Sequence, residues 1–560
     1  MMISRRIKLT TKYWMSKQFP YFDNDDDYAD EQNQDGGANK KQWTTFEHNG
    51  VLFPPEYVPH KVPIVYEGKE IVLPPLAEEY ATLYAKFIDT EYISKIFNKN
   101  FWNDWKTTLK DTGITSLDAV DFTKIKEYLA DLKKNKSKLS KEEKQEAKET
   151  KDAEEAKYKI AKVDGVEQPV GNFRIEPPGI FMGRGCHPKM GSIKRRIEPE
   201  DITINIGKEA PVPPAPKGHN WGSVIHDQYV RWLASWIDTI NGDNKYVWLA
   251  AQSNWKAESD RNKFDLARKL KKNIKHIKAI NETNMNNPEE KVKQIATALY
   301  FIDNLALRVG NEKSDDEADT VGVTTLRVEH IKFLDNLDIE LDFLGKDSIR
   351  YVKKVQVTQQ VYDNLKLFTK GKEPKDDLFD KMNATDLNKY LQEFMKGLTA
   401  KVFRTYNASY LFQKELKKIS KKFDTLDEDS KINKLYDEYN KANAKVALLC
   451  NHQKKVTTSF NDQIKKIDQQ IKKTKKLLRA ANKKERIDKL RKKIDELKAK
   501  KNIKVDLKGV ALGTSKTNYI DPRITVAFIK KHGLSPDKIY TKPLQEKFFW
   551  AFQVDENFKF

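Results

Sequence analysis

The sequence predicts an α+β protein with several domains. Residues 50–55 and 71–75 are short apolar runs that end in proline pairs, a pattern typical of strands followed by turns. From residue 78 to about residue 109, apolar side chains recur at helical spacing. Two heptad segments between residues 461 and 504 indicate long helices near the C-terminus. Because the chain has 560 residues, it is long enough for two or three domains with their own cores.

The middle of the chain alternates exposed helices with aromatic and turn-forming segments. Residues 133–157 are mostly Lys, Glu, Gln and Ala, which predicts a solvent-exposed helix with ion pairs four residues apart. The proline-rich residues 210–216 predict a rigid surface connection. Aromatic and polar residues alternate over 221–251, and a basic helix is expected over 261–278. Residues 342–350 predict two strands around a Gly-Lys-Asp-Ser turn.

Residues 461–504 predict an antiparallel coiled-coil hairpin. Their apolar residues fall at a and d spacing in two arms, Ile464, Ile467, Ile471 and Leu478 in the first and Ile487, Leu490, Ile494 and Leu497 in the second. A polar turn separates the arms, so each arm can cover its apolar seam only by folding onto the other. The segment holds 18 Lys or Arg against 6 Asp or Glu, so we expect a basic outer surface.

Charge and composition favour a nucleic-acid partner and exclude several other classes. The net charge is +21, from 103 basic against 82 acidic residues, which suits a polyanion. No phosphate-binding loop of the GxxxxGK[ST] type occurs, so ATP hydrolysis is not expected. Cys186 and Cys450 lie far apart, which argues against a zinc site and a disulfide framework. No apolar run approaches the roughly 20 residues of a membrane span.

Two acid-rich stretches do not predict a metal site. Residues 23–27 belong to a polar N-terminal tail that we expect to be disordered over 1–42, and residues 314–319 are expected to form a solvated turn. The first 22 residues are basic and lack the apolar core of a signal peptide, so a disordered tail is favoured over a transit peptide.

Tyr519 is the candidate nucleophile. It stands in the segment SKTNYIDPR at 515–523, which follows the basic hairpin. A phenol has a pKa near 10, so its attack on a phosphodiester requires fixed positive charge around the phosphorus and an acid for the leaving oxygen. Metals or side chains can supply both.

Four isolated basic residues could form such a metal-free site. Arg308 is expected at the end of an apolar helix, where the alternative is a buried ion pair with Glu312. Lys346 lies at the predicted hairpin tip, where a lysine is usually only solvated. Arg404 lies in an apolar, aromatic segment, and His452 is expected on the last turn of a helix, where a capping role is the alternative. Two arginines and a histidine can bind nonbridging phosphate oxygens, and a lysine can act as the acid.

These residues lie in blocks that resemble the eukaryotic-type DNA topoisomerase I family, type IB. The blocks are LALR at 305–308, FLGKDSIR at 343–350, KVFRTYNAS at 401–409, LCNHQ at 449–453 and SKTNYIDPR at 515–523. The resemblance covers residues 43–560 in order.

The resemblance implies a fold and a reaction. It implies a bilobed DNA clamp with a mixed α/β N-terminal cap, a mainly helical catalytic lobe, a coiled-coil linker and a small helical C-terminal domain. The expected boundaries are 43–241 for the cap, 242–456 for the catalytic lobe, 457–508 for the linker and 509–560 for the C-terminal domain. Supercoils of both signs would relax through single-strand cleavage and a 3′-phosphotyrosine at Tyr519, followed by religation. Neither ATP nor an essential divalent metal is implied.

The resemblance also implies which side chains approach double-stranded DNA. Residues 176–191, EPPGIFMGRGCHPKMG, are similar to the family's DNA-clamping segment. The implied DNA-binding residues are Arg184, His187, Lys189, Lys194, Arg195, Arg196, Asp347 and Asn518. Phe181, Arg184, Asp347 and Asn518 match positions near camptothecin-type inhibitors in the family. Met182 and the pair Thr324-Thr325 depart from the family pattern, which puts inhibitor affinity or phosphate contacts in doubt before activity.

Partners and location follow from the family alone. A monomer in the nucleus is implied, with an organelle or a large-virus particle as alternatives. A tyrosine recombinase uses similar chemistry but usually lacks the cap blocks and the basic hairpin. A non-catalytic DNA-binding scaffold is the other alternative, and it predicts that Tyr519→Phe changes nothing.

Overall fold

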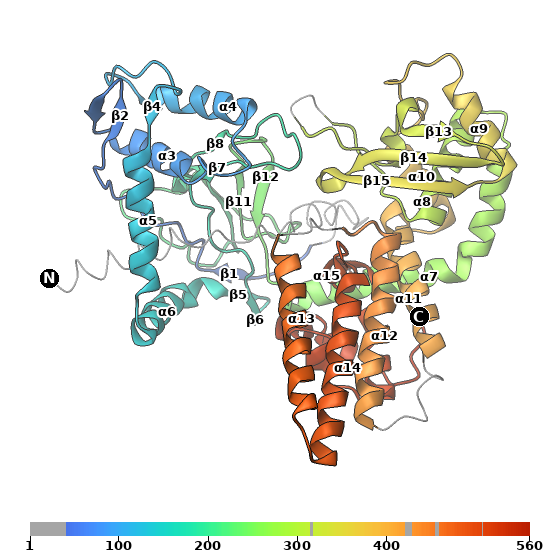
Figure 1. Cartoon of the computed structure of the whole chain (residues 1–560). Helices are drawn as coiled ribbons and strands as arrows, with labels where there is room; N and C mark the ends of the chain where they lie inside the picture. Colours follow the sequence, from blue (N-terminus) through green and yellow to red (C-terminus); the bar gives the residue numbers. More distant parts are fainter. Residues whose placement is uncertain (1–40, 314–316, 420–427, 454–457, 507) are drawn as a thin grey trace. The chain divides into compact units, whose positions relative to one another are not determined.

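The computed structural model describes residues 41–313, 317–419, 428–453, 458–506 and 508–560 (Figure 1). The chain divides into two compact units, residues 1–258 with 313–319 and residues 259–312 with 320–560. The first unit is rich in short strands and the second is mainly helical, so the expected mixture of α and β structure is confirmed. Most of the predicted N-terminal tail, residues 1–40, and part of the predicted acidic turn, residues 314–316, lie outside the described residues.

Among the described residues of unit 1, the strands form four small sheets. Three strands pair in the order β1-β5-β6, four in the order β10-β9-β11-β12, three in the order β3-β2-β4, and β7 pairs with β8. All of these pairs are antiparallel except β10 with β9. The strands are β1 Phe46–His48, β2 Ile64–Tyr66, β3 Lys69–Ile71, β4 Val120–Asp121, β5 Ile160–Val163, β6 Val166–Pro169, β7 Gly179–Ile180, β8 Ile193–Lys194, β9 Thr203–Asn205, β10 Ser223–Ile225, β11 Ala234–Ile237 and β12 Asn244–Val247.

The helices of unit 1 correct two sequence predictions. They are α3 Pro75–Ala85, α4 Lys95–Trp105, α5 Thr123–Ser137 and α6 Lys141–Glu155. The single helical segment expected over 78–109 is two helices, because the Ser94 side chain caps a new helix by accepting from Phe97 N. The exposed helix expected over 133–157 is also divided, because Ser140 and Glu143 form a capping box that starts α6.

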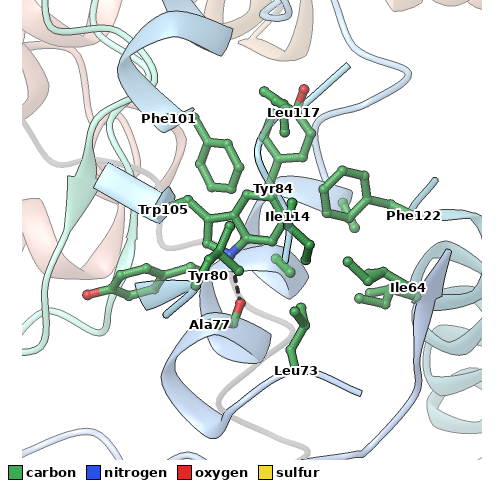
Figure 2. Packing of buried hydrophobic residues seen from close by; sticks show 14 of the residues in the cluster. Ile64, Leu73, Ala77, Tyr80, Tyr84, Phe101, Trp105, Ile114, Leu117 and Phe122 are labelled. Atoms are coloured by element: carbon green, nitrogen blue, oxygen red, sulfur yellow. Dashed lines mark hydrogen bonds between the residues drawn. The ribbon is translucent and has the colours of Figure 1, made fainter. Parts of the chain in front are cut away.

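An aromatic core joins α3 and α4 to the small sheet of β2, β3 and β4. Figure 2 shows Tyr84, Phe101, Trp105 and Phe122 packed together, and Trp105 Nε1 donates to Ala77 O at 3.0 Å. Burying such rings contributes much of the stability of a small core. A second core lies between the β1-β5-β6 and β10-β9-β11-β12 sheets and includes fully buried Phe46, Ile204, Leu233 and Val247.

Unit 2 is built mainly from helices around one antiparallel sheet of order β13-β14-β15. The strands are β13 Ile331–Phe333, β14 Asp338–Gly345 and β15 Ile349–Gln356. The helices are α7 Asn254–Asn284, whose first turn lies in unit 1, α8 Glu290–Leu305, α9 Gln359–Thr369, α10 Ala384–Phe394, α11 Ala400–Ile419, α12 Glu428–Leu449, α13 Thr458–Arg479, α14 Lys484–Asp506, α15 Leu512–Thr514, α16 Pro522–Lys531 and α17 Lys542–Lys547. Short 3₁₀ turns across the chain are Lys106–Thr108, Ala156–Lys159, Pro199–Asp201, Val323–Thr325, Val328–His330, Lys346–Ser348, Pro536–Lys538 and Phe549–Gln553.

The two helices predicted within 461–504 are α13 and α14, which lie side by side and are joined by a short turn (Figure 1). Ile467, Ile471 and Ile494 are buried, and Lys501 Nζ pairs with Asp468 at 2.7 Å across the two helices. The predicted strands at 342–350 are the ends of β14 and β15. Within the described ranges, no helix has the length and apolar content needed to cross a membrane.

Candidate active site

Tyr519 ends a π-helical turn, Ser515–Tyr519, that the sequence did not predict. The turn closes with a hydrogen bond from Ile520 N to Ser515 O at 2.9 Å. Ser409 on α11 holds its end, since Ser409 Oγ donates to Tyr519 O and accepts from Asp521 N, both at 3.0 Å. π-Turns are rare and are frequent at functional sites. The Tyr519 backbone is therefore fixed on both sides of the residue, and its side chain is buried.

Arg404 on α11 lies against the Tyr519 ring. Its Cζ atom is 5.0 Å from the ring centroid, and the residue is only 4% exposed. Nη1 donates to Ala306 O and Nη2 donates to Cys450 O at 3.1 Å, whereas the buried Nε has no hydrogen-bond partner. Burial lowers the pKa of Arg404, but Tyr519 and Cys450 raise it by more, so the guanidinium stays charged. A buried N–H group without a partner is costly, which points to a missing acceptor at this place.

His452 lies just beyond α12 and not on its last turn, which corrects the sequence prediction. The helix ends in a Schellman motif: Asn451 has φ 54°, Asn451 N donates to Leu448 O, and His452 N donates to Ala447 O. This motif turns the imidazole toward Tyr519, with the two ring centroids 5.1 Å apart.

The His452 ring has one bonded and one unbonded nitrogen. Nδ1 lies 2.7 Å from Ser515 Oγ, and the buried Nε2 has no partner. Burial, followed by the charges of Arg404 and Arg308, lowers the pKa of His452 to about 3. The imidazole is therefore neutral near pH 7.

Arg308 lies in an extended segment after α8, which also corrects the predicted helix end. The helix stops because Ala306 adopts a left-handed conformation with φ 52°. Arg308 O then accepts from Val323 N at 2.9 Å, and Val309 O accepts from Thr324 N at 2.7 Å. No ion pair joins the half-buried Arg308 to Glu312, both of which lie in the described part of the chain. The charge of Arg308 acts on His452 and Cys450, so the guanidinium lies near these two residues.

Lys346 is half-buried at the tip of the β14–β15 hairpin. Asp347 and Ser348 have φ of 67° and 54°, which makes the tight turn that presents the lysine. The same hairpin carries Tyr351, whose hydroxyl is buried without a hydrogen-bond partner. Burial raises the pKa of Tyr351 to about 12 although the charge of Arg404 acts against it, so this strand lies near Arg404. The sequence analysis had no signal for a role of Tyr351.

The predicted DNA-binding residues of unit 1 lie on and after the connection between β7 and β8. Arg184 is exposed between Gly183 and Gly185, which both have positive φ. Phe181 and His187 form an edge-to-face ring pair at 4.8 Å. Lys189 Nζ donates to Ile240 O at 3.0 Å.

The three basic residues that follow are held by acids of unit 1. Lys194 pairs with Glu176, Arg195 makes two bonds to Asp201 at 2.8 and 3.0 Å, and Arg196 pairs with Glu79 at 2.9 Å. Contact of these residues with phosphate stays a prediction. Asp347 is exposed, and Asn518 is half-buried on the π-turn beside Tyr519.

The structure thus brings Tyr519, Arg404, His452 and Arg308 together in unit 2. Two buried nitrogen atoms, Arg404 Nε and His452 Nε2, have no hydrogen-bond partner among the described residues. The oxygens of a phosphodiester would accept from Arg404 Nε, and from His452 Nε2 when that nitrogen carries the proton, and the phosphate charge would be attracted by the two arginines. The described residues contain no group of three His, Cys, Asp or Glu side chains that could hold a metal ion.

Three family models match consecutive parts of this chain. The catalytic core of eukaryotic DNA topoisomerase I matches residues 252–486, its DNA binding fragment matches residues 41–249, and the C-terminal topoisomerase domain matches residues 491–560. All three models describe DNA topoisomerases.

Individual relatives agree with the models. DNA topoisomerase 1 beta of Arabidopsis thaliana is 46% identical over 94% of this chain and 60% of its own length. DNA topoisomerase 1 of Homo sapiens is 44% identical over 93% of this chain and 72% of its own length. The chain therefore belongs to the eukaryotic DNA topoisomerase I family. It spans about 60% of the length of the Arabidopsis relatives.

Proposed function

We propose that this protein relaxes positive and negative DNA supercoils by cutting and rejoining one strand, as a type IB isomerase. The observation that carries the proposal is the contact of Tyr519 with Arg404 and His452, whose Nε and Nε2 atoms are buried without acceptors. Family membership and the printed names of the relatives support the same reaction.

In the proposed reaction, the Tyr519 hydroxyl loses its proton to water, its oxygen attacks the scissile phosphorus, and the bond from phosphorus to the 5′ oxygen breaks. The product is a 3′-phosphotyrosine and a free 5′ hydroxyl. Arg308, Arg404 and His452 stabilise the nonbridging oxygens. Lys346, at the tip of the hairpin, protonates the departing 5′ oxygen. Religation is the reverse step, so ATP is not needed. Torsional strain in the DNA drives the rotation between the two steps.

The remaining expectations belong to the same proposal. Unit 1 would serve as the DNA-binding cap of a clamp, with Arg184, His187 and Lys189 beside the duplex. The boundaries predicted from the sequence, at 241, 456 and 508, would separate cap, catalytic lobe, linker and C-terminal domain. The enzyme would act as a nuclear monomer without an essential divalent metal. Its sensitivity to camptothecin-type inhibitors would depend on Phe181, Arg184, Asp347 and Asn518.

The test is relaxation of plasmids supercoiled in each direction, with EDTA and without ATP. Wild type should relax both, whereas Tyr519→Phe should bind DNA, relax neither plasmid and form no covalent adduct. Tyr410→Phe, at an exposed tyrosine of unit 2, controls for the loss of a phenol hydroxyl. Equal relaxation by Tyr519→Phe would overturn the assigned nucleophile. Relaxation that requires ATP or a metal would overturn the proposed reaction class.

A further inference from the structure

We propose that Ser515 is a positioning residue that holds His452 in the tautomer with its proton on Nε2, so that the imidazole can donate to a phosphate oxygen. This inference rests on the proposed function, because the donation by His452 to a phosphate oxygen belongs to the site proposed there. It adds a residue that the sequence analysis placed only within the tyrosine segment.

The first step concerns the charge of His452. Arg404 and Arg308 face the imidazole with positive charge, and Cys450, Tyr519 and Tyr351 are the other titratable groups around these side chains. Burial and the two arginines keep the ring neutral. A neutral imidazole has one N–H and one lone pair on its two ring nitrogens, so only one nitrogen can donate. Donation to phosphate by Nε2 requires that Nδ1 carry the lone pair.

The second step concerns the direction of the hydrogen bond between Ser515 and His452. Ser515 is fully buried, and among the described residues His452 Nδ1, at 2.7 Å, is the partner of its hydroxyl. If the hydroxyl donates to Nδ1, its hydrogen is satisfied and Nε2 carries the proton. If Nδ1–H donated instead, the serine hydrogen would be buried without an acceptor, which is unfavourable. The geometry therefore favours the Nε2–H tautomer.

The third step concerns the place of Ser515 in the chain. Ser515 begins the same π-turn that Tyr519 ends, and the turn follows a segment joined to His452 by a hydrogen bond from Ala511 N to His452 O at 2.9 Å. Docking of this segment thus delivers the nucleophile and fixes the tautomer of His452 in one event. Before docking, the histidine would lack the serine that selects its tautomer.

The experiment records long-range ¹H–¹⁵N spectra of the full chain, deuterated and labelled with ¹⁵N-histidine, at pH 7 without DNA. His452→Gln assigns the signal. Wild type should show a protonated Nε2 and an unprotonated Nδ1 at His452. Ser515→Ala should lose this pattern and give a mixture of tautomers or the Nδ1–H form, whereas Ser515→Thr should retain it.

Single-turnover cleavage provides the second readout. Ser515→Ala should slow cleavage about 10-fold, the value of one hydrogen bond of about 1.4 kcal/mol, with DNA affinity unchanged. Ser515→Thr should restore most of the rate. Ser409→Ala is the matched control, because Ser409 is an equally buried serine that contacts the Tyr519 backbone and not His452. It should slow cleavage but keep the wild-type tautomer.

The outcomes separate this inference from the proposed function. An Nδ1–H tautomer in wild type, or an unchanged tautomer and rate in Ser515→Ala, would overturn the role of Ser515. If wild type failed to cleave DNA but Ser515→Ala still changed the tautomer of His452 as expected, the proposed function would fail. The relationship between Ser515 and His452 would stand. If Ser515→Ala unfolds, the wild-type and Ser515→Thr spectra alone decide the tautomer.

Discussion

Arg404 donates a hydrogen bond to the backbone carbonyl of Ala306, two residues before Arg308. Its second Nη donates to the carbonyl of Cys450, two residues before His452. One buried guanidinium therefore ties together the two chain segments that carry the other phosphate-binding candidates. Arg404 also lies against the Tyr519 ring, so it contacts the candidate nucleophile as well as these two segments.

We expect Arg404→Lys to lower the single-turnover cleavage rate by about 100-fold or more. Lysine keeps the charge, but its single nitrogen cannot reproduce the planar fork that reaches both carbonyls while leaving Nε for the phosphate. DNA affinity, measured with Tyr519→Phe in the background, should change little. Arg327→Lys is the control, because Arg327 pairs with Glu329 at 2.8 Å in another part of unit 2. A rate within a few-fold of wild type would contradict the role of the fork.

Gly310 is predicted to be essential for placing Arg308. It has φ 93°, and a Cβ there would lie 2.8 Å from Gly322 Cα. We expect Gly310→Ala to destabilise unit 2 by several kcal/mol and to reduce cleavage more than DNA binding, because the backbone after Arg308 must move. Gly371→Ala separates the two causes, since Gly371 has φ 76° with nothing within 4 Å of its Cβ. Thermal unfolding and cleavage of both variants provide the measurements. If Gly310→Ala and Gly371→Ala lost stability and cleavage to the same extent, the positive φ of the glycine would explain the effect of Gly310→Ala. The close approach to Gly322 would then have no effect of its own.

Elements with strong local signals could be predicted from the sequence. The seams of Ile467, Ile471 and Ile494 predict α13 and α14, because two apolar faces at heptad spacing must cover each other. The turn around Lys346 predicts the β14–β15 hairpin for a similar local reason. These features depend on neighbours that are close in sequence.

The site could be predicted only as a set of residue types. Arg308 and His452 were expected on helices, but Ala306 and Asn451 adopt left-handed conformations that end α8 and α12 earlier. Ala306 carries no stop signal, and Asn451 is a weaker signal than glycine. Contacts between distant segments, such as that of Ser515 with His452, have no periodic signature in the sequence. They became visible only when the segments were placed together.

His452 should make stability depend on pH in the acidic range. Its folded-state pKa of about 3 lies below the unfolded value of about 6.5, so below pH 6.5 the unfolded chain takes up a proton that the folded protein does not. Stability should therefore fall as pH falls from 6.5 toward 3, by up to about 1.4 kcal/mol per pH unit, and should not depend on this group above pH 7.

Urea unfolding at pH 7.0 and 5.5 measures this effect. The difference in free energy of unfolding between wild type and His452→Gln should shift by up to about 1.3 kcal/mol between the two pH values, to the disadvantage of wild type at pH 5.5. His276→Gln, at an exposed histidine of α7, is the control for the loss of an imidazole. A constant difference between wild type and His452→Gln would mean that His452 titrates normally in the folded protein.

Removal of the α13–α14 hairpin should leave the site intact but weaken the hold on DNA. Gln453 pairs with Val510 in an antiparallel bridge, and Ala511 N donates to His452 O, so the chain before α13 and the chain after α14 are joined to each other. A short Gly-Ser connection in place of residues 461–504 can therefore close the chain without moving His452 or Tyr519. The deletion removes 18 basic and 6 acidic residues, a net charge of +12.

We expect more distributive relaxation and a shallower fall of DNA affinity with salt, because fewer counterions are released on binding. Relaxation time courses on plasmid at several salt concentrations measure both effects. A second variant keeps α13 and α14 but replaces four exposed lysines with Gln, namely Lys472, Lys475, Lys489 and Lys493. It separates the effect of the hairpin's charge from the effect of its length. Unchanged processivity and salt dependence in the deletion would show that the hairpin does not act on DNA.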